Sequence, residues 1–428
     1  MLVLALVLVS LAARATIVTT NLDEDNGSLG GGSGISLREA VRYSPSSSTI
    51  TFSSALSGKI IRLTLGQIII GKSLTINASA LAARLTLSGD KTGNGRTNGD
   101  TGVIYISSGT IVLDSLAISG GFASNGGGIY IGSGTTVTVR NSAISGNYGT
   151  DGGGIYSYGS LLIENSTLVG NSSDYHGGCI FNRGSLTLRN SKLEGSSLTS
   201  PTGVGGGIYN DGSTSIYDST FSGNTAQSSG GCIYNVGPLT VYNSSFSGNS
   251  AVYGGAFYNY SSTVDIYSST FLNNYAPFGG ALYITDGTVN LNNSTFAKNS
   301  ADFGGAINAV YGIANLNNCT LSGNSAASYG GGIFSNSISS VTLQSSIVAG
   351  NFAPQDPNLV GRVASTNSLT SGSPRLAPLG DYGGLTHTMP PLPGSPAIGT
   401  GGTPVLTTDQ RGMLRDVFPD MGAAEYQG

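Results

Sequence analysis

Large apolar residues return at a nearly constant interval through the middle of the chain. A block of Gly-Gly-(Gly/Cys/Ala) followed by a large apolar residue occurs nine times, at intervals of 24 to 28 residues. Two alternating apolar positions, a polar corner, another apolar residue and an Asn then follow, as in Val289, Leu291, Asn293, Phe296 and Asn299. Periods of about 20 to 50 residues indicate a solenoid or a propeller. The repeated apolar positions are Ile129, Ile155, Ile180, Ile208, Ile233, Phe257, Leu282, Ile307 and Ile333.

The spacing inside each repeat separates the possible repeat folds. Alternation with a period of two indicates strands, and paired glycines every 25 residues or so would destabilise helices. A propeller blade needs about 40 residues, whereas about 25 residues hold three short strands and three bends. We therefore expect an all-β parallel β-helix of about 12 coils, roughly 55–60 Å long at the usual strand spacing.

Equivalent positions of successive coils should form columns along this solenoid. The Asn that ends most repeats forms one column, in which Ser196 is an interruption. Asn tolerates the left-handed backbone of a sharp bend, and stacked Asn amides can bond from one coil to the next. The predicted ladder consists of Asn147, Asn171, Asn224, Asn249, Asn274, Asn299, Asn324 and Asn351.

Aromatic residues form two further columns that we expect to face outward. One contains Tyr217, Tyr242 and Tyr267, between Arg189 and Asn292. The second follows the Gly-Gly block and contains Tyr130, Tyr156, Phe181, Tyr209, Tyr234, Tyr258 and Tyr283. Rings stacked on one another would stiffen the sheet, and exposed rings would bind sugars or a protein partner. Tyr217, Tyr242 and Tyr267 are the predicted ligand-binding residues.

Composition and charge exclude several classes of function. Only 9% of residues are charged, and the net charge of −4 leaves no basic patch for nucleic acid. Three Cys cannot make a disulfide framework, and Cys179 and Cys232 stand two coils apart. With two His in the chain, no metal site or cofactor is expected.

The two ends of the chain differ from the repeats. Residues 1–15 have the apolar run and small-residue cleavage site of an export signal, and no other run is long enough to span a membrane. Residues 16–110 should form an N-terminal cap and the first coils. A capping box at Ser36-Leu37-Arg38-Glu39 predicts a short helix there. The repeats occupy 111–351. Residues 352–428 hold ten of the 14 Pro and should form an irregular C-terminal cap.

Three segments resemble known families of exported bacterial proteins. Ile35-Ser36-Leu37-Arg38-Glu39-Ala40 resembles the CSLREA domain, with Ile in place of its Cys. Gly304-Gly305-Ala306-Ile307 and Phe296-Ala297-Lys298-Asn299 resemble the repeats of polymorphic outer-membrane proteins. The tail resembles the choice-of-anchor Q domain in the segments Asp381-Tyr382-Gly383-Gly384, Gly394-Ser395-Pro396-Ala397-Ile398, Thr408-Asp409-Gln410-Arg411-Gly412 and Asp420-Met421-Gly422-Ala423-Ala424-Glu425. Gly399 stands where that pattern usually has Asp.

These resemblances imply a right-handed parallel β-helix that is exported to the bacterial surface or the medium, without an established chemistry. The chain has no room for the membrane β-barrel that ends polymorphic outer-membrane proteins. It also ends at Gly428, where choice-of-anchor proteins usually continue into a sorting segment. We therefore expect a protein that is released or held noncovalently.

An enzyme that cleaves polysaccharides is the main alternative, because many β-helix proteins are such enzymes. Hydrolysis needs clustered carboxylates, and elimination needs a base. The Gly-His-Gly and Arg-Ile-Lys motifs of the polygalacturonase family are absent. The best cluster consists of Asp151 and His176, at equivalent positions of successive coils, with Asp174 two residues before the His. Polar loop residues beside a Gly bend are the simpler interpretation of this cluster.

The sequence favours a non-enzymatic, exported β-helix of adhesin-like or structural type, whose partner is a cell-surface glycan or protein. A polysaccharide lyase or glycoside hydrolase and a passive carbohydrate-binding module remain the alternatives. Fold alone does not choose among them.

Overall fold

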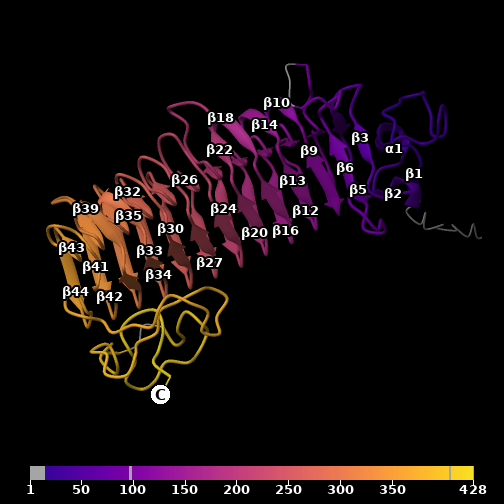
Figure 1. Ribbon diagram of the computed structural model, residues 1–428. Helices are drawn as coiled ribbons and strands as arrows, with labels where there is room; N and C mark the ends of the chain where they lie inside the picture. Colours follow the sequence, from indigo (N-terminus) through magenta and orange to yellow (C-terminus); the bar gives the residue numbers. More distant parts are fainter. Residues whose placement is uncertain (1–14, 96–98, 404–405, 428) are drawn as a thin grey trace, which may run out of the picture.

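The chain winds into a long solenoid of parallel strands in the computed structural model, which describes residues 15–95, 99–403 and 406–427 (Figure 1). Three long sheets run along the solenoid, one with 14 strands and two with 12, which corresponds to about 13 turns. The fold predicted from the repeat is thus confirmed, with about one turn more than expected. Residues 1–14, which hold most of the expected export signal, lie outside the described residues.

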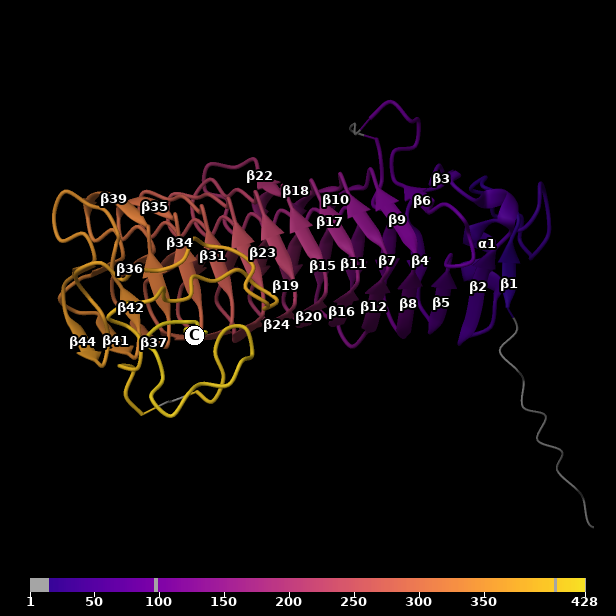
Figure 2. The ribbon, with the colours of Figure 1, turned by 60° about the horizontal axis from the view of Figure 1, so that its bottom comes forward.

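Each long sheet takes one strand from each coil, and its strands are parallel throughout (Figure 2). Sheet A contains β1 (Thr16–Val18), β2 (Ser48–Phe52), β5 (Leu74–Asn77), β8 (Thr110–Asp114), β12 (Thr136–Arg140), β16 (Ser160–Glu164), β20 (Ser185–Arg189), β24 (Ser213–Tyr217), β27 (Leu239–Tyr242), β30 (Thr263–Tyr267), β33 (Thr288–Asn292), β37 (Ile313–Asn317), β41 (Ser340–Gln344) and β44 (Val363–Thr366).

Sheet B follows sheet A around each coil, and sheet C closes the coil. Sheet B contains β3 (Ile60–Arg62), β6 (Leu85–Ser88), β9 (Leu116–Ser119), β13 (Ala143–Ser145), β17 (Thr167–Val169), β21 (Lys192–Glu194), β25 (Thr220–Ser222), β28 (Ser245–Ser247), β31 (Thr270–Leu272), β34 (Thr295–Ala297), β38 (Thr320–Ser322) and β42 (Ile347–Val348). Sheet C contains β4 (Ile68–Ile70), β7 (Ile104–Ile106), β11 (Ile129–Ile131), β15 (Ile155–Ser157), β19 (Ile180–Asn182), β23 (Ile208–Asn210), β26 (Ile233–Asn235), β29 (Phe257–Asn259), β32 (Leu282–Ile284), β36 (Ile307–Ala309), β40 (Ile333–Ser335) and β43 (Leu359–Val360).

Some coils carry a fourth short strand between sheets B and C, which the repeat pattern did not predict. A four-stranded sheet contains β10 (Phe122–Asn125), β14 (Tyr148–Asp151), β18 (Ser172–His176) and β22 (Ser197–Leu198), and a two-stranded sheet contains β35 (Ser300–Phe303) and β39 (Ser325–Tyr329). The Gly-Gly corner follows each of these positions. The first Gly has a left-handed backbone, as at Gly152 (φ +59°), where an added Cβ would lie 2.4 Å from the Ile155 carbonyl oxygen. This contact explains why Gly recurs there.

Strand register keeps equivalent residues in contact from coil to coil. Ile129 pairs with Ile155, which pairs with Ile180 in turn. Because side chains alternate across a strand, one side of every strand fills the interior, and a single apolar core extends from Val18 to Val348. Within it, four Phe rings stack at centroid distances of 4.5 to 5.0 Å. These rings belong to Phe221, Phe246, Phe271 and Phe296.

The predicted asparagines form a buried ladder on the inner side of the corner after sheet B, in two runs separated by Ser196. Within each run, an Asn donates from Nδ2 to Oδ1 of the Asn one coil on, as Asn274 does to Asn299 (2.9 Å). The same Nδ2 also donates to a main-chain oxygen one coil back, Phe246 O for Asn274 (3.0 Å). Ser196 interrupts the ladder, because its short side chain offers no amide to Asn171, although its backbone N–H still donates to Oδ1 of Asn224 (3.1 Å). The left-handed residue of this corner is the one before the ladder position, which is Gly at most coils, as at Gly248, and Asn273 or Lys298 at two of them. The ladder Asn itself therefore acts as a hydrogen-bonding group.

Two more polar ladders lie inside the solenoid and were not predicted. In the first, the hydroxyl of each Ser in a column accepts the backbone N–H of its counterpart one coil earlier, as Ser269 does from Ser244 (3.1 Å). Cys319 continues this column, and its N–H donates to the hydroxyl of Ser346 (3.0 Å). The second is an Asn ladder at the end of the sheet C strands. Its members are Asn182, Asn210, Asn235 and Asn259.

The N-terminal end is covered by helix α1 (Leu37–Tyr43), after which the chain enters β2 and a short 3-10 helix, η1 (Ser54–Leu56). Both hydrogen bonds of the predicted capping box are present, between Ser36 and Glu39. The helix contacts β1 and β4 and buries Leu37, Ala40 and Val41. The expected cap therefore covers the first coils through an apolar helix face.

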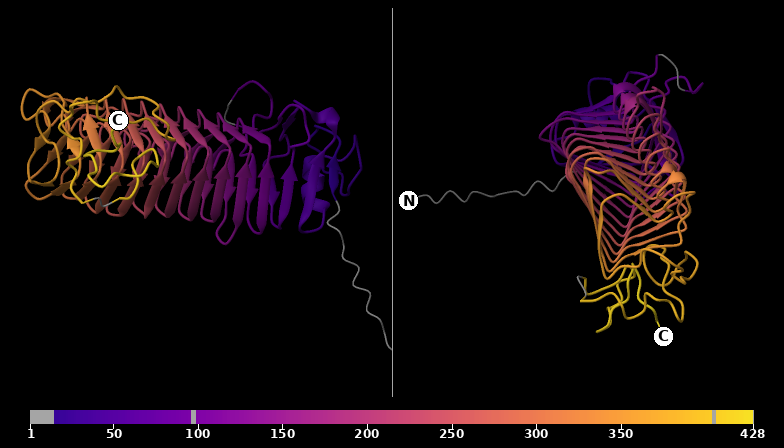
Figure 3. Two further views of the ribbon diagram at one scale, coloured as in Figure 1. Left: turned by 90° about the horizontal axis from the view of Figure 1, so that it is seen from below. Right: turned by 90° about the vertical axis from the view of Figure 1, so that its left-hand side faces the viewer.

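The C-terminal tail is irregular, as predicted, but it lies along the side of the last coils and not over their end as a cap would (Figure 3). The final coil still contributes β43 and β44, so strands continue past residue 351. Beyond that coil the tail bonds to the corner between sheets A and B, where the amide of Gln410 contacts the hydroxyls of Thr270 and Thr295. A buried ion pair joins Arg415 to Glu425, and Arg415 also donates to Oδ1 of Asn293 (2.8 Å).

Candidate functional site

Two of the three residues of the predicted acid–base cluster are in direct contact. Asp151 ends β14 and His176 ends β18, one coil apart, and the register places them opposite each other. Nδ1 of His176 lies 2.7 Å from Oδ1 of Asp151. A carboxylate accepts only, so Nδ1 carries the proton. The second nitrogen of the ring, Nε2, makes no hydrogen bond within the described residues, and the His side chain is 40% exposed.

Asp174, the third predicted residue, is held in a different set of contacts. Its Oδ1 accepts hydrogen bonds from the hydroxyls of Tyr148 and of Thr199, the latter at 2.6 Å. No hydrogen bond joins Asp174 to His176 or Asp151 among the described residues. The structure thus assembles a His–Asp pair instead of a three-residue cluster.

Polar residues stand on the opposite side of the sheet C rings from this pair. Arg183 donates from Nε to Asp211 (3.1 Å) and from Nη1 to the hydroxyl of Tyr158 (3.3 Å). Its guanidinium lies 5.1 Å from the centre of the Phe181 ring. The Tyr156 hydroxyl donates to that of Tyr158 at 2.9 Å. We call Asp151, His176, Tyr158, Arg183 and Asp211 the polar cluster.

The polar cluster covers the rings between its two sides. The His176 ring stands edge-on to Tyr209, with centroids 4.8 Å apart. Tyr156 and Phe181 point outward from their strands, yet both are buried under the cluster. Burial raises the pKa of Tyr156, whereas the hydrogen bond from Tyr156, with that from Arg183, lowers the pKa of Tyr158. The cluster therefore offers a free imidazole nitrogen, a guanidinium, a carboxylate and a phenol on three successive coils.

Sequence reasoning missed Tyr158, Arg183 and Asp211. These residues occupy the same position of successive coils, directly after the last residue of β15, β19 and β23. The sequence held one signal for them. Tyr, Arg and Asp follow one another at the same position of three successive repeats, near the position of the Asp151–His176 pair.

The predicted Tyr column ends three strands of sheet A, and its rings stack face to face. Tyr217 and Tyr242 have centroids 5.4 Å apart, and Tyr242 and Tyr267 have centroids 4.6 Å apart. Arg189 covers the outer face of Tyr217 at 4.9 Å. The interior ring faces are therefore occupied, so a ligand at this column would meet ring edges and hydroxyls.

The second aromatic column stacks in the same way along sheet C and is longer than predicted. Tyr105 extends it by one coil, and neighbouring centroids lie 4.6 to 5.7 Å apart from Tyr105 to Tyr283. Burial raises the pKa of Tyr234, Tyr258 and Tyr283 within it. The rings under the polar cluster, Tyr156, Phe181 and Tyr209, are members of this column.

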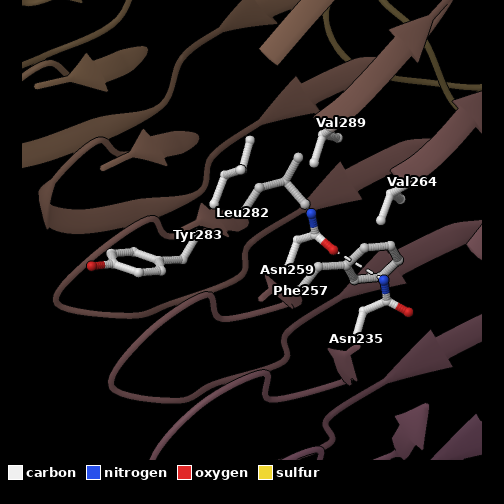
Figure 4. A pocket seen from close by; sticks show the side chains of 8 residues that line it. Asn235, Phe257, Asn259, Val264, Leu282, Tyr283 and Val289 are labelled. Carbon is white, nitrogen blue, oxygen red and sulfur yellow. Dashed lines mark hydrogen bonds between the residues drawn. The ribbon is translucent and has the colours of Figure 1, made fainter. Parts of the chain in front are cut away.

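A small internal cavity lies beneath the same sheet (Figure 4). It measures about 10 Å³ and lies between the Asn235–Asn259 hydrogen bond and the apolar side chains of Phe257 and Leu282. This volume is at the lower limit for one water molecule. The cavity is therefore too small for a substrate, and the outward faces are the candidate binding surfaces.

The described part of the chain contains no group of three or more His, Cys, Asp or Glu that could hold a metal ion. It also contains no helix with the length and apolar character to cross a membrane. The three Cys are buried and unpaired, and burial raises the pKa of the Cys179 and Cys319 thiols to about 12.

Comparison with known proteins supports the fold. Residues 154–326 match the family described as "Right handed beta helix region". No curated protein sequence matches the chain. Among solved structures, pectate lyase Pel9A has a TM-score of 0.40 at 14% identity, over 97% of this chain and 98% of that one. A Family 28 exopolygalacturonase of Yersinia enterocolitica has a TM-score of 0.35 at 10% identity, over 84% of this chain and 79% of the other.

Proposed function

We propose that this protein is a non-enzymatic, exported β-helix that recognises a cell-surface glycan in the manner of an adhesin. The observation that carries the proposal is the polar cluster. Nε2 of His176 can accept a hydrogen bond from a sugar hydroxyl, and Arg183 can donate one. Asp211 and Tyr158 add an acceptor and a second hydroxyl. Polar groups exposed on both sides of the buried rings can bond the hydroxyls along the edge of a sugar.

The three-sheet scaffold supports recognition through its rigidity. The members of the polar cluster are held in two hydrogen-bonded groups, because Asp151 orients His176, and Asp211 and Tyr158 orient Arg183. A site whose groups are already oriented loses less entropy on binding. Export is supported by the N-terminal signal pattern and by the resemblance of both ends to exported proteins.

A glycan array probed with the purified protein tests this proposal. If a glycan binds, His176→Ala and Arg183→Ala should each weaken binding by about tenfold or more, which is about 1.4 kcal/mol. Tyr242→Ala is the matched control, because it removes a ring from the other aromatic column. Loss of binding only with Tyr242→Ala would move the site to the column of Tyr217, Tyr242 and Tyr267. Affinity that survives all three changes would contradict recognition at either face.

A carbohydrate-active enzyme is the second candidate, favoured by the Asp151–His176 hydrogen bond. The pair fixes the imidazole tautomer and leaves Nε2 able to take a proton, as a general base requires. Incubation with a panel of polysaccharides, followed by assays for new reducing ends and unsaturated products, separates the two candidates. Turnover that disappears in His176→Gln and falls in Asp151→Asn would establish the enzyme. Binding without products supports passive recognition.

A further inference from the structure

The last strand of sheet A leaves one edge without a partner strand. β44 pairs with β41 on one side only. The N–H of Ser345 donates to the carbonyl oxygen of Thr366 (3.1 Å), so the backbone of Thr366 faces β41. Successive residues of a strand direct their N–H and C=O groups to opposite sides. The backbone groups of Val363 and Ser365 therefore point away from the sheet, and no strand pairs with them among the described residues.

The last strands of the other two sheets are protected. In sheet B, Val348 donates its N–H to the carbonyl oxygen of Leu369 (2.8 Å), so a further chain segment covers β42. In sheet C, the segment that leads into β43 contains Pro354, Asp356 and Pro357. Proline and charge are common means of preventing edge pairing.

β44 has no chain segment paired over it, and the one charge near it is Arg362, which directly precedes the strand. The sequence of β44 is Val-Ala-Ser-Thr, without proline or charge. The tail's hydrogen bonds to the coils run to residues from Ser268 to Ser345 at their side, and its Gly402 packs against the side chain of Asn367, one residue beyond β44. No tail residue pairs with β44 itself among the described residues. In the end-on view of Figure 3, the final coil faces the viewer and the tail lies to one side. The end of sheet A is therefore an accessible pairing edge.

We propose that β44 pairs antiparallel with β44 of a second copy, which joins two solenoids end to end. A two-fold axis at Ala364 places Val363 opposite Ser365 of the second copy, and Ser365 opposite its Val363. Both pairs then exchange two N–H···O bonds, because all four residues direct their backbone groups outward. This register satisfies every free backbone group of Val363 and Ser365.

The side chains at this register are self-complementary, which is why a second copy is the occupant. Ala364 meets its own counterpart in the close, non-hydrogen-bonded position, where Cα atoms lie about 4.5 Å apart, and its methyl group is small enough for that contact. No charges stand opposite each other within the paired strands. A two-fold axis perpendicular to sheet A places the core-facing side of sheet A in both copies on the same side of the joined sheet. Val363 and Leu359, which pack partly buried against the open end of the core, would then gain cover.

Measurement of molar mass across a concentration series, by light scattering after size exclusion, tests the proposal with the full chain. The wild type should approach twice the monomer mass as its concentration rises. Ala364→Lys places two like charges across the two-fold axis and should give a monomer. Thr342→Lys is the matched control, because Thr342 pairs with Ala364 in register and is also exposed, but lies one coil inside the end. This control should still dimerise.

A mixture of variants tests the register itself. Ala364→Lys mixed with Ala364→Glu should restore the dimer mass, because opposite charges then meet at the axis. Unchanged circular dichroism of each variant shows that the fold is intact. A wild type that remains monomeric at all concentrations would overturn the proposal. So would a dimer that survives Ala364→Lys, or a mixture that stays monomeric.

Discussion

Replacement of Asn274 by Ala measures how much the buried Asn ladder stabilises the solenoid. In the native protein, Oδ1 of Asn274 accepts the backbone N–H and the Nδ2 of Asn249, at 3.1 and 2.9 Å. Its own Nδ2 donates to Asn299 and to the carbonyl oxygen of Phe246. All of these residues lie in the same column or in the core beside it.

The magnitude follows from the groups that lose a partner. In Asn274→Ala, three buried groups lose a hydrogen-bond partner. They are the backbone N–H of Asn249, one side-chain N–H of Asn249 and the carbonyl oxygen of Phe246. Asn299 still accepts from the backbone N–H of residue 274. At about 1 kcal/mol for each buried group left unpaired, the free energy of unfolding should fall by about 3 kcal/mol.

Guanidinium unfolding followed by circular dichroism is the assay. Asn125→Ala is the matched control, because Asn125 is exposed on β10 and makes no side-chain hydrogen bond among the described residues. Its effect should stay below about 0.5 kcal/mol. If both variants unfold at the same midpoint as the wild type, the ladder does not stabilise the corner in the way argued above.

Three further changes have defined outcomes. Ser196→Asn should raise the free energy of unfolding by about 1 kcal/mol, because the new amide joins the ladder between Asn171 and Asn224. A lower midpoint of unfolding would contradict this. Arg415→Ala leaves Glu425 buried without its cation and should destabilise the docked tail by about 3–5 kcal/mol. Limited proteolysis should then cut the chain faster at sites after residue 370. An unchanged rate of cleavage would refute this prediction. Burial raises the pKa of several sheet C tyrosines above 10.0, so the folded state binds more protons than the unfolded state. The contribution of these tyrosines to stability is complete below pH 10 and is lost as the pH rises through their pKa in the folded state. A melting temperature that does not fall as the pH rises above 10 would contradict this prediction.

The repeat made the architecture predictable, because every coil presents the same inward pattern. The Asn positions and the α1 capping box followed from residue type and spacing. The Ser ladder was not predicted, since Ser is common throughout this chain and nothing in its spacing distinguishes a buried Ser from an exposed one. Its role depends on the neighbouring coil, where the hydroxyl of Ser269 meets the backbone of Ser244.

The candidate site was predictable only in part. Equivalent positions predicted that Asp151 and His176 would meet, and they do. Side-chain direction decided the rest, because Asp174 turns to Tyr148 and Thr199 while Arg183 reaches across Phe181. The stacking of Tyr217, Tyr242 and Tyr267 depends on ring rotation, which spacing does not determine. The path of the tail along the side of the solenoid depends on contacts such as that of Gln410 with Thr270, which link distant segments.

The docking of the tail also orders the assembly of the molecule in time. The partners of the tail lie far back in the sequence, for example Ser269, 141 residues before Gln410. Its contacts span four successive coils, from Ser268 to Ser345. The tail is the last segment to leave the ribosome, and its binding surface exists only after those coils have stacked. Loop closure over such a separation is slow compared with the addition of one coil to the next. Tail docking is thus a late step of folding, which only chains whose final coils are in register can complete.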